Sequence, residues 1–146
     1  MTAIRPTYYA LPLIGWKEDV SLPQMGPGTL VAKIDTGARS AALHAEQVRI
    51  VGRRVMFAVQ LGGKRRTFQA PLSGEKRIKS SNGAAEQRPV IKLEIQVGLH
   101  RFFADVTLTD RTDMGVPMLL GREAIKGRFL VHPGKRFMLR RQRVMS

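Results

Sequence analysis

One acidic residue stands where an apolar segment ends. The run from Leu30 to Ile34 predicts a buried strand, and Asp35, Thr36 and Gly37 follow it directly. Moving a carboxylate out of water costs several kcal/mol unless it is paired or hydrogen-bonded, so this acid needs local partners. Glycine allows close backbone approaches, and a threonine hydroxyl can hold a neighbouring backbone group. The acid is therefore a candidate for general acid–base chemistry, and the alternative is an acid that only caps a turn.

A second segment, far along the chain, combines a short apolar run with a short predicted helix. The apolar run 118–120 follows Pro117 and predicts a short buried strand. Residues 121–126 then have the length of one or two helical turns.

The two segments together resemble parts of the retropepsin-like aspartic proteases. The tetrad 35–38 is similar to their catalytic loop, and 117–125 is similar to the stretch that crosses behind this loop and opens a short helix. The resemblance implies catalytic roles for Asp35, Thr36 and Gly37. It also implies structural support of the loop by Leu120, Gly121 and Arg122.

A closer resemblance runs from about Leu13 to about Leu139. It is to a bacterial family named as ATP-dependent zinc proteases, whose members are often linked to the ATP-grasp ligases that add glutamates to a ribosomal protein. It implies an all-β, retropepsin-like closed β-barrel with one short helix and one subunit per chain. We expect a flexible N-terminal arm over 1–12, the domain over 13–141 and a tail over 142–146.

A single Asp-Thr-Gly motif determines the assembly that this chemistry needs. Aspartic proteolysis uses two carboxylates about 3 Å apart that share one proton, because like charges so close do not both ionise. The chain carries one such motif, so activity requires a symmetric homodimer that brings two copies of Asp35 together. In retropepsins the chain ends form a shared dimer sheet, and both ends of this chain are expected to pair between subunits.

The sequence departs from the retropepsin pattern immediately after the tetrad 35–38. Retropepsins often place an acid there, which contacts the substrate backbone and pairs with the downstream arginine. This chain has Arg39 instead, and we expect it to pair with Glu123. With Ala38, Arg39 is a predicted substrate contact, and its charge favours an acidic peptide.

The segment between Pro71 and Pro89 has few apolar residues and contains the tight-turn pair Asn82-Gly83. A surface loop is one interpretation. The resemblance places here the flap, a hairpin that closes over substrate and shields the chemistry from water. In that interpretation Ser81, Asn82 and Gly83 contact the substrate.

The rest of the domain shows strand periodicity. Alternating apolar residues predict one half-buried strand over 55–61, a turn at Gly62-Gly63 and a basic returning strand. A β-hairpin is predicted for 90–108, a first strand for Ile14–Val20, and final strands for 129–131 and 137–139.

The balance of charges is unusual for 146 residues. There are 25 Lys and Arg residues against 11 Asp and Glu, a formal net charge of +14. Such a surface attracts polyanions, namely acidic peptides, nucleic acid or anionic membranes. We expect an acidic peptide or protein as partner; nucleic acid is the weaker interpretation because no recognisable reading motif accompanies the charge. No apolar run is long enough to span a membrane, and the lack of cysteine fits a cytoplasmic protein.

The sequence contains no compact metal or nucleotide motif. His44, His100 and His132 are far apart, without the His-Glu-x-x-His spacing of zinc proteases, and no phosphate-binding Gly-rich loop occurs. We therefore predict no metal site and no cofactor. Two functions remain: a homodimeric aspartic peptidase acting on acidic peptides, and a catalytically silent module that binds such a peptide in the same cleft.

Overall fold

β3 lies at the centre of the fold and leads directly to Asp35. The computed structural model describes residues 10–79, 83–110 and 114–140. Within these residues the strands are β1 (Leu13–Gly15), β2 (Lys17–Ser21), β3 (Thr29–Ile34), β4 (Ala41–His44), β5 (Glu46–Val51), β6 (Arg54–Leu61), β7 (Lys64–Pro71), β8 (Gly74–Lys79), β9 (Ala85–Val97), β10 (His100–Thr109), β11 (Met118–Leu120) and β12 (Leu130–His132). One short helix, α1 (Arg122–Ile125), and a 3-10 turn over Pro23–Met25 complete them.

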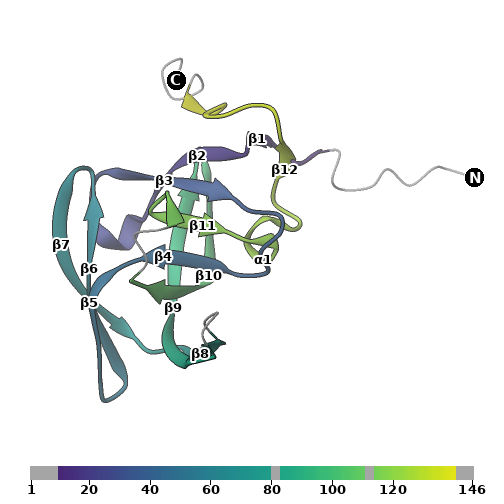
Figure 1. Ribbon diagram of the computed structural model, residues 1–146. Helices are drawn as coiled ribbons and strands as arrows, with labels where there is room; N and C mark the ends of the chain where they lie inside the picture. The colour runs from purple at the N-terminus through teal and green to yellow at the C-terminus, as the bar shows by residue number, and fades with distance from the viewer. Residues whose placement is uncertain (1–9, 80–82, 111–113, 141–146) are drawn as a thin grey trace, which may run out of the picture.

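Six strands close a ring around the core. The pairing order is β10-β4-β11-β3-β2-β9, and β9 pairs with β10 again, so the ring has no open edge (Figure 1). β8 joins this sheet outside the ring, on β9. The predicted all-β fold with one short helix is confirmed, and the closed ring is the expected barrel.

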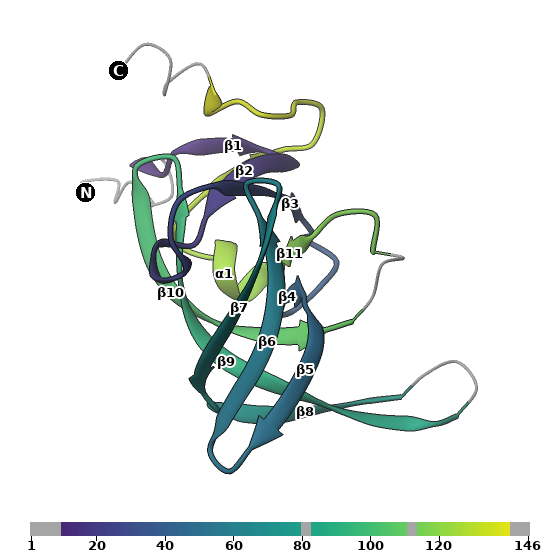
Figure 2. The same cartoon turned by 90° about the vertical axis from the view of Figure 1, so that its left-hand side faces the viewer.

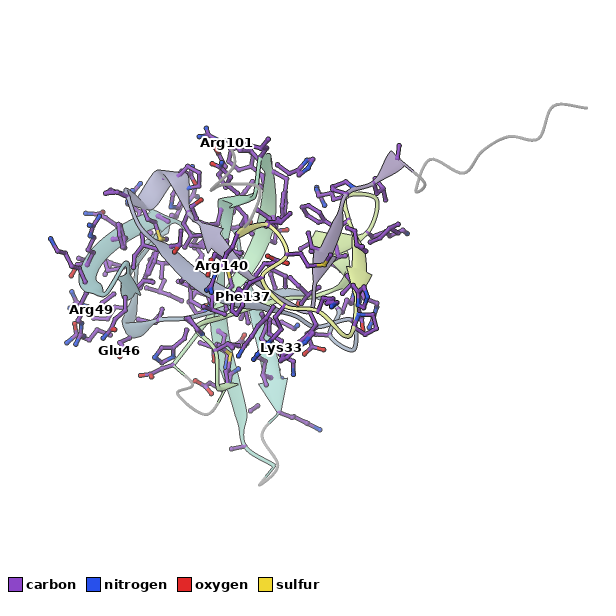
Figure 3. All side chains as sticks on the ribbon, turned by 90° about the horizontal axis from the view of Figure 1, so that it is seen from above. Lys33, Glu46, Arg49, Arg101, Phe137 and Arg140 are labelled. Carbon is purple, nitrogen blue, oxygen red and sulfur yellow. The ribbon has the colours of Figure 1, made fainter. Side chains whose placement is uncertain are left out.

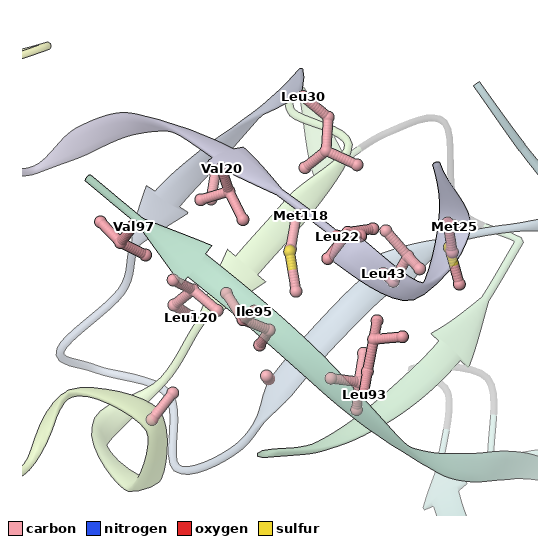
Figure 4. Packing of buried hydrophobic residues seen from close by; sticks show 14 of the residues in the cluster. Val20, Leu22, Met25, Leu30, Leu43, Leu93, Ile95, Val97, Met118 and Leu120 are labelled. Atoms are coloured by element: carbon pink, nitrogen blue, oxygen red, sulfur yellow. The ribbon is translucent and has the colours of Figure 1, made fainter. Parts of the chain in front are cut away.

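The core consists of the apolar residues that alternate along these strands. Ile91, Leu93, Ile95 and Val97 on β9 are all buried, as the period of two predicted. Side chains from β2, β3, β4, β9 and β11 meet inside the ring (Figure 4). Burying this apolar surface is the main force that holds the sheet closed.

β5, β6 and β7 form a separate three-stranded sheet beside the ring (Figure 2). Val55, Phe57, Val59 and Leu61 lie on its inner face and pack against the core, as predicted for the strand 55–61. The tight turn at Gly62-Gly63 is also confirmed, with positive φ angles of 61° and 79°. At Gly62 a side chain would meet the backbone of Gly28, so the turn seats closely against the start of β3.

The N-terminal strand prediction is wrong in one respect. Residues 14–20 form two strands, β1 and β2, separated at Trp16. A Cβ on Gly15 would lie 2.4 Å from the carbonyl oxygen of Lys135, and the Trp16 N–H donates to the same oxygen at 2.9 Å. The chain bends here because the C-terminal segment crosses it.

The C-terminal prediction also needs correction. β12 begins at Leu130, and residues 137–139, predicted as a strand, form a turn without strand pairing. The backbone N–H groups of Met138 and Leu139 donate to Glu18, a completely buried carboxylate that also accepts from Gly15. The Glu18 carboxylate therefore accepts the two N–H groups that a neighbouring strand would otherwise have bonded.

The same C-terminal segment is held at the surface by a second acid. Arg140 donates to both oxygens of Asp19 at 2.6 and 3.0 Å, and its guanidinium lies 3.6 Å from the Phe137 ring centre (Figure 3). The hydrogen bond to Asp19 raises the pKa of the Arg140 guanidinium above its ordinary value. Because the Arg140 side chain is exposed, solvent screens this ion pair and its contribution to stability is small.

The segments nearest the two chain ends pair with each other inside one chain. β1 and β12 run parallel in a two-stranded sheet, with Leu13 opposite Leu130 and both side chains partly exposed. Pairing of the ends between subunits remains a prediction. No described helix is long and apolar enough to span a bilayer.

Candidate active site

Asp35 directly follows the last residue of β3 and is half-buried. Its backbone N–H donates to the carbonyl oxygen of Leu120 at 2.9 Å. Its carboxylate accepts a hydrogen bond from the Gly37 N–H at 3.0 Å. A Cβ on Gly37 would lie 3.3 Å from the same carboxylate oxygen, closer than most such contacts. The loop therefore holds its own acid by one backbone amide and keeps the space beside it free.

The predicted supporting residues lie directly behind this loop. β11 runs parallel to β3 and places Leu120 opposite Ile34. Arg122 donates from its side chain to the Thr36 carbonyl at 3.0 Å and from its backbone to the Ala38 carbonyl at 2.8 Å. The segment 120–122 thus holds the acidic loop at both ends, at Asp35 through Leu120 and at Ala38 through Arg122.

Gly121 makes this close crossing sterically feasible. A Cβ on Gly121 would lie 2.4 Å from the Ser40 carbonyl oxygen and 2.7 Å from the Ser40 nitrogen. Contacts this short with backbone atoms require the loop itself to move. Glycine is needed here for space, because its backbone angles are ordinary extended ones.

Thr36 and Gly37, at the tip of the loop, are exposed. Their position leaves the loop tip open in the single chain. Ala38 is half-buried and Arg39 is exposed. The described contacts assign no substrate to either residue, so their predicted roles remain predictions.

The expected ion pair between Arg39 and Glu123 is confirmed. The Arg39 Nε atom lies 2.8 Å from a Glu123 carboxylate oxygen, and the Glu123 backbone N–H also donates to the Arg39 carbonyl. The side chains are 81% and 56% exposed, so the pair contributes only modestly to stability, about 0.2–1 kcal/mol. Its interest is its place beside the acidic loop.

The region predicted as a loop or flap is a hairpin of β8 and β9. Lys79 pairs with Ala85 at its outer end, and Gly83 there is exposed with a φ of 84°. Ser81 and Asn82 lie outside the described residues. β9 begins five residues earlier than the predicted strand, because its outer half has β8 as a partner.

Sequence reasoning missed two residues of this region, Ser40 and Lys76. The Lys76 ammonium on β8 donates to the Ser40 hydroxyl at 2.8 Å, which links the hairpin to the segment after the acidic loop. A hollow of about 270 Å³ lies beside this contact, lined also by Arg39, Asp105 and Glu123. Local sequence patterns carried no signal for this contact, because it depends on the register of β8 on β9.

The three histidines lie on three different strands, β4, β10 and β12. His44 ends β4 beside Glu46, His100 begins β10 and packs against the Phe129 ring, and His132 accepts from the Gly134 N–H. Among the described residues, no group of three His, Asp or Glu side chains is arranged to hold a metal ion.

A comparison with protein-family models finds one family that matches most of this chain. Residues 13–142 match the RimB-like model, described as retropepsin-like aspartic endopeptidase RimB. The chain belongs to this family. The match spans both the acidic loop and the helix that supports it.

Curated relatives include larger proteins named as ligases. The chain is 36% identical over 138 residues to a probable alpha-L-glutamate ligase from Shewanella halifaxensis, covering 89% of this chain and 30% of that protein. It is 33% identical over 129 residues to a protein of the same name from Parasynechococcus marenigrum, covering 83% and 28%. The chain thus spans less than a third of the length of these relatives.

A solved structure supports the fold. A Legionella pneumophila protein of unknown function superimposes with a TM-score of 0.73 and 30% sequence identity. The match covers 88% of this chain and 98% of the Legionella chain.

Proposed function

We propose that this RimB-like chain is one subunit of a homodimeric aspartic endopeptidase that cleaves acidic polypeptides. Asp35 from each subunit supplies one of the two carboxylates. One of them acts as general base towards a water, and the other, protonated, donates to the scissile carbonyl. Thr36 then hydrogen-bonds across the dimer axis, and Gly37 leaves room for substrate.

The observation that carries this proposal is the fixation of the acidic loop. Its carboxylate is oriented by the Gly37 N–H, and its backbone is held by Leu120 and Arg122. A catalytic acid needs such positioning, because small displacements from the reactive geometry are costly in rate. An acid that merely caps a turn does not need a second element locked to the loop from behind.

The preference for acidic substrates is supported by the hollow that Ser40 and Lys76 line. Lys76 and Arg39 both line it, together with two acids, Asp105 and the Glu123 that Arg39 currently contacts. A carboxylate side chain of the substrate would find two cations there, within the stronger class of charge-assisted hydrogen bonds. The net charge of +14 attracts such a substrate over longer distances.

Glutamate-rich polypeptides are the substrates we favour. Relatives of this chain carry the matching region within proteins named probable alpha-L-glutamate ligases. A peptidase linked to such a ligase would act on the glutamates that the ligase adds. The same relatives also favour a second candidate, a silent module that binds the acidic product in this cleft.

The test is peptide cleavage by the wild type and by Asp35→Asn, with a library that includes glutamate-rich sequences, over about pH 4 to 7. We expect cleavage that Asp35→Asn abolishes, pepstatin inhibits and EDTA leaves unchanged. Cleavage that survives the substitution but stops with EDTA would instead establish a metal peptidase. Tight binding without cleavage by either protein would favour the silent module.

The dimer requires its own experiment. Analytical ultracentrifugation should show a concentration-dependent dimer. Mixing wild type with an excess of Asp35→Asn should lower the activity per wild-type chain, because a mixed dimer holds only one competent acid. Activity that stayed proportional to the wild-type concentration would rule out the shared site.

A further inference from the structure

One face of the three-stranded sheet is directed outward and is rich in arginine. Cross-strand partners share a face, and the register pairs Gln60 with Arg65, Ala58 with Thr67 and Met56 with Gln69. On the other side of β6, Arg49 pairs with Met56 and Glu46 pairs with Ala58. The outer face therefore combines Arg49, Arg54 and Arg65 with amide, hydroxyl and thioether groups.

These arginines are oriented by neighbours but remain available. The Arg49 guanidinium lies 3.7 Å from the Met56 sulfur, and Arg54 donates to the Gln69 side-chain oxygen at 3.1 Å. Arg65 lies 3.2 Å from Glu46. A guanidinium has five N–H donors in a planar fork, so each retains donors for a further acceptor.

Two pockets lie along this sheet. One pocket, of about 480 Å³, lies between Gln60 and Arg65 of this sheet and the end of β4. A second, of about 510 Å³, is lined by Arg49, Met56 and Thr67. β6 lines both pockets. Met56 lines the second pocket, and Ala58 and Gln60, two and four residues further along the strand, line the first. The two pockets therefore follow one another along β6.

This face lies away from the acidic loop. The first pocket contacts Thr29, where β3 begins, whereas Asp35 follows the end of that strand. Six residues of extended chain separate the two by about 20 Å. Figure 3 shows Glu46 and Arg49 well apart from Lys33, which precedes the acidic loop by two residues.

We propose that this arginine-bearing face binds an extended acidic segment of a polypeptide, at a second surface separate from Asp35. The face carries three arginines and one acid, Glu46. Its amide and hydroxyl groups are suited to hydrogen-bonding a peptide backbone. The strand length suits about eight residues of extended peptide. The binding does not depend on cleavage, so it stands or falls separately from the peptidase proposal.

The chemistry favours a peptide over single-stranded RNA. Proteins bind single strands largely by stacking bases on exposed aromatic rings. Within residues 46–71, all of which the structure describes, the aromatic residues are Phe57 and Phe68. Both lie on the inner face, with ring centres 6.0 Å apart, where they pack against the core. The arginine-bearing face thus has cations without a stacking platform.

The experiment measures binding of a fluorescent peptide of about ten glutamates by anisotropy. All proteins carry Asp35→Asn, so the probe is not cleaved. The test variant adds Arg49→Gln, Arg54→Gln and Arg65→Gln. The control adds Lys126→Gln, Lys135→Gln and Arg136→Gln, which are exposed, lie outside the three-stranded sheet and give the same net charge.

We expect the three substitutions of the test variant to raise the Kd for the peptide about tenfold. The control variant should raise it less than twofold. Equal changes in both would mean nonspecific attraction and would overturn the proposal, as would no change in the test variant. A third variant with lysine at the three positions keeps the charge and should retain most of the binding. Its failure to bind, with the fold intact by circular dichroism, would also count against a charge-based surface.

An oligouridylate serves as the competing probe. If it bound as tightly as the peptide, and if the same three substitutions abolished this binding, the surface would belong to nucleic acid and our proposal would be wrong. Cleavage of short peptides, with Asp35 restored, should be unaffected by the three substitutions. This separates failure of the second surface from failure of the active site.

Discussion

Arg39 and Glu123 form an ion pair of 2.8 Å across the junction between the acidic loop and its supporting helix. At the same junction, Arg122 donates to the carbonyl of Thr36. The helix therefore contacts the loop through two successive residues of opposite charge. Because Arg39 stands where retropepsins often have an acid, the charges at this junction are reversed relative to that pattern.

We predict that Arg39→Glu slightly lowers the free energy of unfolding and clearly reduces the rate at which acidic peptides are cleaved. The substitution places two acids together, and it removes a cation from the hollow beside Lys76. The double variant Arg39→Glu/Glu123→Arg should recover the stability, by about 0.2–1 kcal/mol, in urea denaturation. It should also recover part of the cleavage. Recovery of neither stability, dimerisation nor activity would remove this pair from the mechanism.

Lys76→Glu is expected to change substrate preference. The ammonium of Lys76 lies at the hollow between β8 and the acidic loop, 2.8 Å from the Ser40 hydroxyl. Reversing its charge should raise KM for glutamate-containing peptides and lower it for lysine-containing ones, with a smaller effect on kcat. Lys135→Glu, exposed in the C-terminal segment and not lining the hollow, is the control. Equal effects of both substitutions on KM would indicate long-range electrostatics instead of a local contact.

Gly121→Ala should destabilise the protein and impair cleavage together. The added Cβ would lie 2.4 Å from a backbone oxygen of Ser40, and the backbone of the acidic loop would have to shift. We expect a loss of about 1–3 kcal/mol in the free energy of unfolding. Gly74→Ala is the matched control, since its Cβ would have no neighbour within 4 Å. A Gly121→Ala protein as stable and active as the wild type would contradict the close crossing.

Glu18→Gln is predicted to loosen the C-terminal segment. The carboxylate is fully buried and accepts from three backbone N–H groups, those of Gly15, Met138 and Leu139. An amide has one acceptor oxygen, so its NH₂ group must face a donor, at a cost of about 1–3 kcal/mol. Hydrogen exchange at residues 138 and 139 should quicken. Glu75→Gln, on an exposed acid, should change neither stability nor exchange.

The strands of the ring were largely predictable because burial imposes a period of two on the sequence. The alternation over β9 and β10, and the inner face of β6, predicted both the elements and their buried residues. The C-terminal end was not predictable in this way. Residues 137–139 have the apolar composition of a strand, but the N–H groups of Met138 and Leu139 donate to the buried Glu18 carboxylate, far earlier in the chain.

The sequence alone determined the acidic loop, its supporting segment and the expectation of an Arg39–Glu123 pair, because short motifs and charges can be read locally. Only the tertiary structure brought Lys76 to Ser40 and aligned Arg49, Arg54 and Arg65 on one face. Those arrangements depend on strand register, and a shift of one residue would turn every side chain to the opposite face. Register is set by contacts between distant segments, which are decided only when the whole chain has closed around its core.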